Sequence, residues 1–275
     1  MDVETGAFWN RELADILEQI DDSTVPGRLD AALQAVAPFD ISVAFAYPQD
    51  REPILLYDGL KNTAPNNALR AYLGGTYLLD PFYLACSRRI LPGLYRMEAL
   101  APDNFFRSEY YHSPAVHPCI SMESGSLAEE IGFFVPLQSG FMATYSLMRS
   151  NGRAAFSDAD FAWLLAIEPM VRLVLSRHWR SIAHAPGAPV RRTSLIQGEA
   201  MEQAFERFAA DRLTQRQRLI VQLILRGHSN LSVSSRLGIT EGTAKLHRKA
   251  IYDRLNISSQ AELFAMFIRF LIEPV

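Results

Sequence analysis

One stretch decides the C-terminal fold of this chain: Leu237-Gly-Ile-Thr-Glu-Gly-Thr-Ala-Lys-Leu-His-Arg248. Gly238 supplies the left-handed residue that a tight turn between two helices needs, since a side chain there would clash. Thr240 follows as a helix N-cap, because a threonine hydroxyl accepts a hydrogen bond from a free amide in the first turn. The stretch therefore predicts a helix-turn-helix whose second helix runs from Glu241 to Leu255.

Three further helices are predicted around this pair of signals. Thr214 is expected to cap the first, which ends at Gly227. The second starts after Ser229 and leads into the turn, and the last begins at Ser258 or Ser259. Apolar residues at helical spacing are expected to form the shared core. They are Leu219, Ile220, Leu223, Ile224, Val233, Leu237, Ala244, Ile251, Tyr252, Leu255, Leu263, Phe264, Phe267 and Ile268.

The helix that begins at Glu241 has the chemistry of a major-groove reader in its first half. Lys245, Arg248 and Lys249 can contact guanine edges or phosphates. The positive end of the helix dipole and its free amides favour a phosphate. Lys245 and Lys249 are four residues apart and share one face, which we expect to be exposed. A solvated basic face on a helical bundle is the alternative that charge alone leaves open.

Four motifs are evenly spaced through this segment. They are Leu213-Thr-Gln-Arg-Gln-Arg218, Gly227-His-Ser-Asn230, the 237–248 stretch, and Ile251-Tyr-Asp-Arg-Leu-Asn-Ile-Ser-Ser-Gln-Ala-Glu-Leu263. Together they resemble the LuxR-type (GerE-like) helix-turn-helix domain, in which the third helix enters the major groove and the fourth pairs two subunits. The resemblance and the basic face imply these DNA contacts: Thr240, Thr243, Lys245, His247, Arg248 and Lys249.

Three residues depart from the family pattern. Gln217 stands where Glu is usual, and Leu231 and Ser232 stand where Lys and Glu are usual. Leu231 in place of Lys removes one cation that could reach a phosphate. We therefore expect altered affinity or site preference, not a loss of DNA binding.

Charge is divided unevenly along the chain. The whole chain has a net charge of −3, but residues 186–275 hold 13 Lys and Arg against 8 Asp and Glu, a net +5. Residues 1–185 hold 14 against 22, a net −8. Because positive charge releases counterions from DNA, the basic part suits DNA and the acidic part suits a different partner.

A stretch rich in proline and glycine, Ala183-His-Ala-Pro-Gly-Ala-Pro-Val190, separates the two parts. We expect a ligand-sensing and dimerisation domain over residues 1–182, a linker over 183–212 and a DNA-binding domain over 213–275. Residues 199–211 of the linker predict a short amphipathic helix that either domain could receive. Its apolar face consists of Ala204, Phe205, Phe208 and Ala209.

Helix and strand patterns alternate through the first domain. Apolar spacing of three and four predicts helices over residues 8–20, 26–36, 67–73, 80–89 and 158–179. Apolar runs predict strands over 41–47, 53–57, 132–137 and 141–148, the last two joined as a hairpin. The fold class is therefore α+β: an N-terminal α-β-α sandwich with an antiparallel sheet, followed by an all-α four-helix domain.

The helix predicted over 158–179 carries two further signals. Ser157 is its expected N-cap. Pro169 should kink the helix unless two helices meet there. The residues expected on its packed face are Phe161, Leu164, Leu165, Ile167, Val171, Leu175 and His178.

A second set of residues lies in the acidic part. In chain order it comprises Pro65-Asn-Asn-Ala68, Tyr72, Leu79-Asp-Pro-Phe82, Tyr95, Gly132-Phe-Phe-Val-Pro136 and Ser146. Their order and spacing are similar to the autoinducer-binding domain of LuxR quorum-sensing regulators, which holds an acyl-homoserine lactone between a sheet and helices. The resemblance implies that Asp80 accepts the ligand amide N–H. The implied ligand site is Ala68, Tyr72, Asp80, Tyr95 and Ser146.

This site departs from the family at two tryptophans. Ala68 and Tyr95 stand where the family has Trp, and the first of these Trp residues donates its indole N–H to the lactone carbonyl. Losing a donor to a buried carbonyl costs ~1–3 kcal/mol, so we expect a different small organic ligand at the same place. Asp80-Pro81 also predicts a helix N-cap with proline in the first turn, a role that can coexist with ligand binding.

The segment Phe105-Phe-Arg-Ser-Glu-Tyr-Tyr-His112 resembles a stretch of LuxR-type regulators whose sensor domain is GAF-like. Arg107, Glu109 and His112 are ionisable and close together in the sequence. The alternative is a solvated helical face with the apolar side chains packed inward. Those side chains are Phe105, Phe106 and Tyr110.

These observations favour a ligand-responsive, dimeric transcription regulator of the LuxR type. Its expected partners are double-stranded DNA, a small molecule of unknown identity and a second copy of the chain, with RNA polymerase as a further candidate. The alternative is a ligand-independent regulator whose N-terminal domain serves dimerisation or protein contacts.

Other function classes lack the residues they need. A phosphorelay receiver needs a late Lys, yet Lys61 is the only Lys in residues 1–185. Cys119 follows Pro118, and no known nucleophile motif surrounds it. The sequence therefore does not favour an enzyme built on this cysteine. We expect no enzymatic activity, no cofactor and no metal, with Cys86 and Cys119 as buried apolar residues. With no signal peptide or membrane span in the sequence, we expect a cytoplasmic protein.

Overall fold

The N-terminal part of the computed structural model is built on a five-stranded sheet in the order β2-β1-β5-β4-β3, with each neighbouring pair antiparallel. The strands are β1 (Ile41–Tyr47), β2 (Ile54–Asp58), β3 (Gly93–Arg96), β4 (Leu127–Pro136) and β5 (Met142–Ser150). The structure describes residues 3–48, 52–59, 69, 72–112, 127–137, 140–184 and 204–272. The expected hairpin is the β4–β5 pair.

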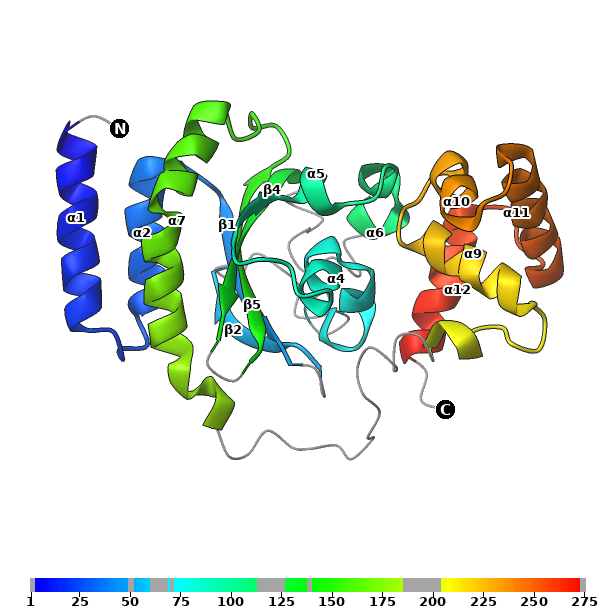
Figure 1. Ribbon diagram of the computed structural model, residues 1–275, viewed down its shortest axis with the longest axis horizontal. Helices are drawn as coiled ribbons and strands as arrows, with labels where there is room; N and C mark the ends of the chain where they lie inside the picture. The colour runs from blue at the N-terminus through cyan, green and yellow to red at the C-terminus, as the bar shows by residue number, and fades with distance from the viewer. Residues whose placement is uncertain are drawn as a thin grey trace.

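Helices cover both faces of the sheet (Figure 1). The α7 face is covered by α2 (Val25–Val36) and α7 (Asp158–His178), with α1 (Val3–Glu18) packed outside α2. Short elements cover the opposite, α4 face: η1 (Thr76–Leu79), α4 (Pro81–Ser87), α5 (Met97–Leu100), η2 (Phe105–Arg107) and α6 (Glu109–His112). The expected α+β class with an N-terminal α-β-α sandwich is confirmed.

Strand alternation divides the core between these two faces. Along β1, Ala44 and Ala46 belong to the core beside α2 and α7, whereas Phe45 and Tyr47 belong to the core beside α4. The small residues let α2 pack closely, and the aromatic residues fill the α4 face. The same alternation fixes which polar side chains of β4 and β5 enter each layer.

Two expectations for this domain need correction. β3 was not predicted, because this short edge strand includes the polar Arg96 and shows no clear apolar alternation. Leu165 was expected on the packed face of α7 but is 51% exposed. Ser157 does cap α7 with a capping box. The helix continues through Pro169 as one element, so two helices do not meet there.

The C-terminal part is the expected bundle of four helices: α9 (Gln215–Leu225), α10 (Asn230–Leu237), α11 (Glu241–Leu255) and α12 (Gln260–Ile272). Thr214, Ser229 and Thr240 cap the first three through their side-chain oxygens. Gly238 has a φ of +64°, the left-handed conformation that the turn requires. Leu219 was expected inward but is 40% exposed, and Val221 of the same helix is buried instead.

The amphipathic segment before this bundle packs on the bundle itself. Residues 204–207 are helical, and the ring of Phe205 stacks on that of Phe267 in α12 with centroids 4.7 Å apart. Phe208 meets the same ring edge-on at 5.2 Å. The aromatic contacts therefore join the end of the linker to the DNA-binding part of the chain. None of the helices in the described ranges is long and apolar enough to cross a membrane.

Candidate ligand site and DNA interface

A buried chain of hydrogen-bonded side chains runs across the α4 face of the sheet. The Thr144 hydroxyl of β5 lies 3.4 Å from the Tyr47 hydroxyl of β1, to which it donates. The Tyr47 and Tyr72 hydroxyls are 2.8 Å apart, and Tyr72 donates to Oδ2 of Asp80 at 2.6 Å. We call Thr144, Tyr47, Tyr72 and Asp80 the polar chain. It links the sheet to the start of α4 through groups that are otherwise surrounded by apolar side chains.

Asp80 is also the N-cap of α4. Its Oδ1 accepts a hydrogen bond from the Phe82 N–H at 2.8 Å, and Pro81 occupies the first helical position. Burial raises the pKa of Asp80, while hydrogen bonds from Tyr72 and from the backbone of Phe82 and Tyr83 act in the opposite direction. The capping role predicted for the Asp80-Pro81 pair is therefore present, and the same carboxyl group also ends the polar chain.

Aromatic rings enclose the polar chain. Phe45 contacts Tyr72 with centroids 4.7 Å apart, Tyr77 contacts Tyr83 at 4.8 Å, and Tyr83 contacts Tyr47 at 5.5 Å. A few polar groups set among many aromatic rings are typical of small-molecule sites.

Gly132 of β4 allows one further ring to approach the sheet on this face. A Cβ at Gly132 would lie 2.7 Å from Cε2 of Phe82, closer than real Cβ contacts permit. Phe82, the second residue of α4, therefore packs directly on the strand. This contact holds α4 against the sheet beside the polar chain.

The predicted ligand residues divide into three groups. Tyr72 and Asp80 are bonded directly, and Ser146 of β5 lies on the same face beside Glu130. Tyr95 sits on the edge strand, with its ring on Phe134 at 5.2 Å and its hydroxyl donating to the Leu91 carbonyl. It therefore takes no part in the polar chain. Ala68 lies outside the described residues.

Glu130 of β4 is a residue of this face that the sequence interpretation missed. It is 6% exposed, Ser146 hydrogen-bonds to it, and its Oε2 has no partner among the described residues. Burial raises its pKa, and the negative charge of Asp80 raises it further. A signal was present in the sequence: Glu129-Glu130 interrupts an otherwise apolar strand, where at least one carboxylate must enter a core layer.

The 105–112 segment follows the alternative interpretation of its ionisable residues. Arg107, Glu109 and His112 are exposed, whereas Phe105 and Tyr110 are buried. The segment forms η2 and α6, and α6 packs against α12 of the DNA-binding domain. It is thus part of the junction between the two domains.

That junction is centred on the turn between α9 and α10 (Figure 1). The Asn104 N–H donates to the Gly227 carbonyl at 2.9 Å, and the Ser229 N–H donates to Oδ1 of Asp103 at 3.0 Å. The Ser229 hydroxyl donates to the other oxygen of Asp103. Gly227 has a φ of +87°, and a Cβ there would lie 2.6 Å from the Cα of Phe105. The sensor backbone therefore touches the helix-turn-helix where only glycine fits.

The candidate DNA-reading side of α11 is open to solvent. Lys245 is exposed and forms an i,i+4 ion pair with Glu241 at 2.8 Å, an interaction of little strength at the surface. Lys249 is exposed as well. Leu246 is 69% exposed although it is apolar, so packing within the chain does not explain its place on this helix.

Three of the other predicted DNA contacts have partners inside the domain. Arg248 donates from Nε to the Tyr252 hydroxyl at 3.0 Å and from Nη2 to Gln260 of α12 at 3.1 Å. The hydroxyls of Thr240 and Thr243 are 2.8 Å apart. Arg248 therefore helps to hold α12 on α11, and any contact with DNA would come in addition to that role.

The family departure at Gln217 has a structural role. Its Oε1 accepts from the Thr214 N–H at 3.1 Å, which completes the cap of α9, and from Arg254 of α11 at 2.8 Å. Gln217 is buried, so its side chain lies inside the bundle and not on the DNA-reading side. Ser232 pairs with His228 at 2.8 Å, while Leu231 is exposed.

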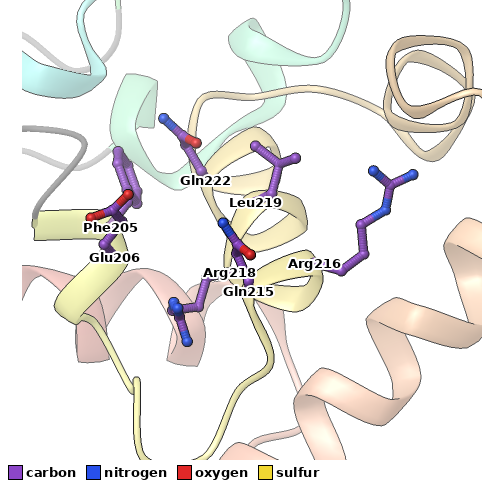
Figure 2. Close-up of a pocket in the computed structure, with 7 residues that line it drawn as sticks. All are labelled: Phe205, Glu206, Gln215, Arg216, Arg218, Leu219 and Gln222. Atoms are coloured by element: carbon purple, nitrogen blue, oxygen red, sulfur yellow. The ribbon is translucent and has the colours of Figure 1, made fainter.

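A surface hollow lies between residues 205–206 and one side of α9 (Figure 2). Its two arginines are committed to the fold, since Arg216 donates to the Leu237 carbonyl and Arg218 to the Leu213 carbonyl, each at 2.7 Å. The hollow is thus a by-product of packing the linker segment on α9. Within the described ranges, no group of His, Cys, Asp and Glu side chains is arranged to hold a metal ion.

Comparison with known proteins places these features in a family. Residues 211–267 match the family model described as bacterial regulatory proteins, luxR family. The chain is also 30% identical over 200 residues to an HTH-type transcriptional regulator in the exeN 3′ region of Aeromonas salmonicida, an alignment covering 70% of this chain and 95% of that protein. This chain belongs to the luxR family. The luxR-family protein is therefore a transcription regulator that carries a DNA-binding helix-turn-helix.

Three further proteins are similar to parts or all of this luxR-family protein. It is 40% identical over 68 residues to the transcriptional regulatory protein MctR of Rhizobium johnstonii, covering 25% of this chain and 29% of MctR. Among solved structures, the VqsR LBD domain from Pseudomonas aeruginosa matches with a TM-score of 0.51 and 23% identity, covering 62% of this chain and 95% of that domain. The match shows that the N-terminal part shares that domain's fold. SdiA of Escherichia coli matches with a TM-score of 0.44 and 14% identity, covering 97% of this chain and 98% of SdiA.

Proposed function

We propose that this luxR-family regulator responds to a small organic molecule bound on the α4 face of its sheet. The observation that carries the proposal is the polar chain from Thr144 to Asp80, buried within a layer of aromatic rings. Burying polar groups costs free energy unless they are satisfied. A fold that needed only a core would place apolar residues there. We assign ligand contacts to Tyr72, Asp80 and Ser146, with Tyr95 at the edge and Ala68 in the adjoining segment.

DNA contact is assigned to the exposed side of α11. Lys245 and Lys249 suit phosphates or guanine edges, and Leu246 suits the methyl group of thymine because it is apolar and exposed. Thr240 and Thr243 lie at the start of the helix, where its free amides favour a phosphate. His247 and Arg248 complete the proposed contact set.

A second copy of the chain is the partner that we propose for α7. Its outer surface carries exposed apolar side chains at Trp163, Leu165 and Leu173, although the rest of the helix is packed on the sheet. Large exposed apolar side chains grouped on one helix are typical of a protein interface. We accordingly assign sensing and dimerisation to residues 1–182, a linking role to 183–212 and DNA binding to 213–275. RNA polymerase is a further proposed partner of the DNA-bound dimer.

The junction at Gly227 offers a route between the two sites. Asp103 and Asn104 follow α5 in the layer that contains α4, and both bond to the α9–α10 turn. A ligand that shifts this layer would move the turn, and with it the helix-turn-helix. This layer would then have two arrangements, one before and one after the shift. The size of the change in DNA affinity is limited by how much more tightly the ligand binds one arrangement than the other.

A thermal-shift screen of the full-length protein tests this function, followed by gel-shift titration with operator DNA. A ligand at 100 times its Kd should stabilise the native state by ~2.7 kcal/mol and should change DNA affinity. Asp80→Asn keeps a capping oxygen at the start of α4 but removes the carboxylate, so it should lose both responses. If stabilising compounds leave DNA affinity unchanged, or if no compound stabilises the protein, the ligand-independent alternative is correct.

A further inference from the structure

The two faces of the sheet treat buried carboxyl groups differently. On the α7 face, Asp30 of α2 accepts hydrogen bonds from Ser42 at 2.5 Å and Tyr57 at 2.8 Å, and also from the Tyr145 hydroxyl. Each carboxyl oxygen of this half-buried Asp30 thus has a hydroxyl partner, as is usual for an acid removed from solvent. On the α4 face, Glu130 is buried with the Ser146 hydroxyl near it, and its Oε2 has no partner in the described chain.

The surroundings of Glu130 are acidic and aromatic. Asp80 lies close enough for its charge to act on Glu130, and among the described residues no arginine, lysine or histidine contributes to the pKa of either carboxyl group. The phenol of Tyr111 on α6 also interacts with Glu130. Glu129, next along β4, faces the opposite layer, where Arg96 pairs with it. In the part of the chain that the structure describes, no cation therefore acts on these two carboxyl groups.

We propose that Glu130 and Asp80 together bind the amino group of a small organic cation, whose apolar part packs among the rings of the α4 face. The inference rests on the proposed ligand-sensing function and specifies its ligand class. Oε2 of Glu130 is the open acceptor, and a protonated amine is a donor that also neutralises the pair.

Two observations favour an amine over other ligand classes. The ring faces of Tyr47, Tyr72 and Tyr83 carry negative potential, which attracts a cation and repels an anion. A carboxylate or phosphate ligand would add negative charge beside two acidic groups, and no cation among the described residues acts on that pair to offset it. A ligand whose polar end is only a carbonyl acceptor finds a donor at Glu130 solely while that group is protonated, so its binding would weaken as pH rises. An amine would show the opposite dependence.

The test uses full-length protein and three matched probes: phenethylamine, the uncharged 2-phenylethanol and the anionic 3-phenylpropanoate. Thermal shift and isothermal titration calorimetry are measured from pH 6 to pH 8.5. Phenethylamine should bind best, more tightly as pH rises, with release of up to one proton per molecule bound.

Glu130→Gln should weaken the binding of phenethylamine by about tenfold or more, the value of a charge-assisted hydrogen bond. Its binding should also lose the pH dependence. Glu98→Gln removes an exposed carboxylate of the same domain and should leave binding unchanged.

Three results would overturn the inference: no binding of phenethylamine to the unmodified protein, equal affinity in the Glu130→Gln variant, or affinity that falls with rising pH. If the Gln variant does not fold, the pH profile and proton release of the unmodified protein decide alone. If 2-phenylethanol stabilises the protein and phenethylamine does not bind, the amine assignment is refuted while the proposal of ligand sensing still stands. Failure of ligand sensing itself is judged separately, by unchanged DNA affinity in the presence of any stabilising compound.

Discussion

The sensor and the DNA-binding domain of this luxR-family protein place their functional side chains in opposite environments. On α11, Lys245, Leu246 and Lys249 face solvent and are free to meet a partner of any size. In the N-terminal domain, Tyr72 is buried and Asp80 is half-buried where the sheet meets α4. An exposed helix can be changed without disturbing the core. A buried polar chain is part of the core, so binding and stability are coupled there.

The two domains also differ in whether the side chains proposed for function are needed for folding. The helix-turn-helix depends on caps and one left-handed glycine for its shape, and it leaves Lys245 and Lys249 of α11 exposed. Arg248 of the same helix differs, because it bonds to Tyr252 and Gln260. In the N-terminal domain, the residues that we propose to bind ligand also hold the fold, since Asp80 caps α4 and also ends the polar chain. Substitutions should separate function from stability in the first domain and couple them in the second.

The largest expected effect is on DNA binding by Lys245→Ala combined with Arg248→Ala. Two lost contacts of ~1–3 kcal/mol each should weaken operator binding by about 100-fold in a gel-shift titration. The melting temperature should fall by only a few degrees, because Arg248 loses two intradomain hydrogen bonds. Arg269→Ala removes an exposed positive charge from α12 and serves as the control. Retained operator affinity in the double variant would refute the assignment of α11 as the DNA reader.

Next in size is Tyr72→Phe, which breaks the polar chain at its centre. Removing this hydroxyl takes a donor from Asp80 and a partner from Tyr47. Leaving buried groups unsatisfied costs ~1–3 kcal/mol, so both the melting temperature and the ligand response should fall. Tyr95→Phe is the matched control, because the Tyr95 hydroxyl bonds only to the Leu91 backbone outside the chain. Equal losses in the two variants would show that the polar chain has no special role.

Gly227→Ala tests the junction between the two domains. Both Gly227 and Gly152 have positive φ, at +87° and +96°, but nothing lies within 4 Å of a Cβ placed at Gly152. Gly152→Ala therefore measures the backbone strain alone, ~1–2 kcal/mol. Gly227→Ala should cost ~1–3 kcal/mol more, because its methyl group meets the Phe105 backbone. Denaturation midpoints that match in the two variants would mean that the junction does not form in solution.

The last effect expected is a change in the pH dependence of stability in Glu130→Gln. Burial and the charge of Asp80 raise the pKa of Glu130 from its ordinary 4.5 to about 8. The folded state therefore binds the proton more tightly than the unfolded state. This contribution to stability is full below pH 4.5 and is lost as pH rises towards 8, with a slope of at most ~1.4 kcal/mol per pH unit. Glu130→Gln should flatten the decline seen by urea denaturation, and an unchanged slope would count against a buried, protonated Glu130.

The sequence was informative where signals are local. Thr214, Thr240 and Gly238 act through their own first turn or their own φ, so they predicted the helices of the DNA-binding domain. The errors came where environment overrides pattern. Leu219 has the right helical spacing but faces a hollow beside the linker segment, and Leu165 lies on the exposed side of α7. Of the predicted ligand residues, the Tyr72–Asp80 pair comes together, whereas Tyr95 lies apart from it. The domain boundaries and the contact residues remain predictions for experiment.

By itself, the sequence determined the helix-turn-helix, its basic face and the α+β class of the sensor, because capping, glycine conformation and apolar periodicity depend on a few neighbouring residues. Only the tertiary structure decided the rest. Strand pairing brings Glu130 beside Ser146 and into the charge field of Asp80, residues remote in the chain. Domain packing set Gly227 against Phe105. Burial and electrostatic environment are sums over such long-range contacts, so Oε2 of Glu130, which has no partner among the described residues, is identified only in the folded molecule.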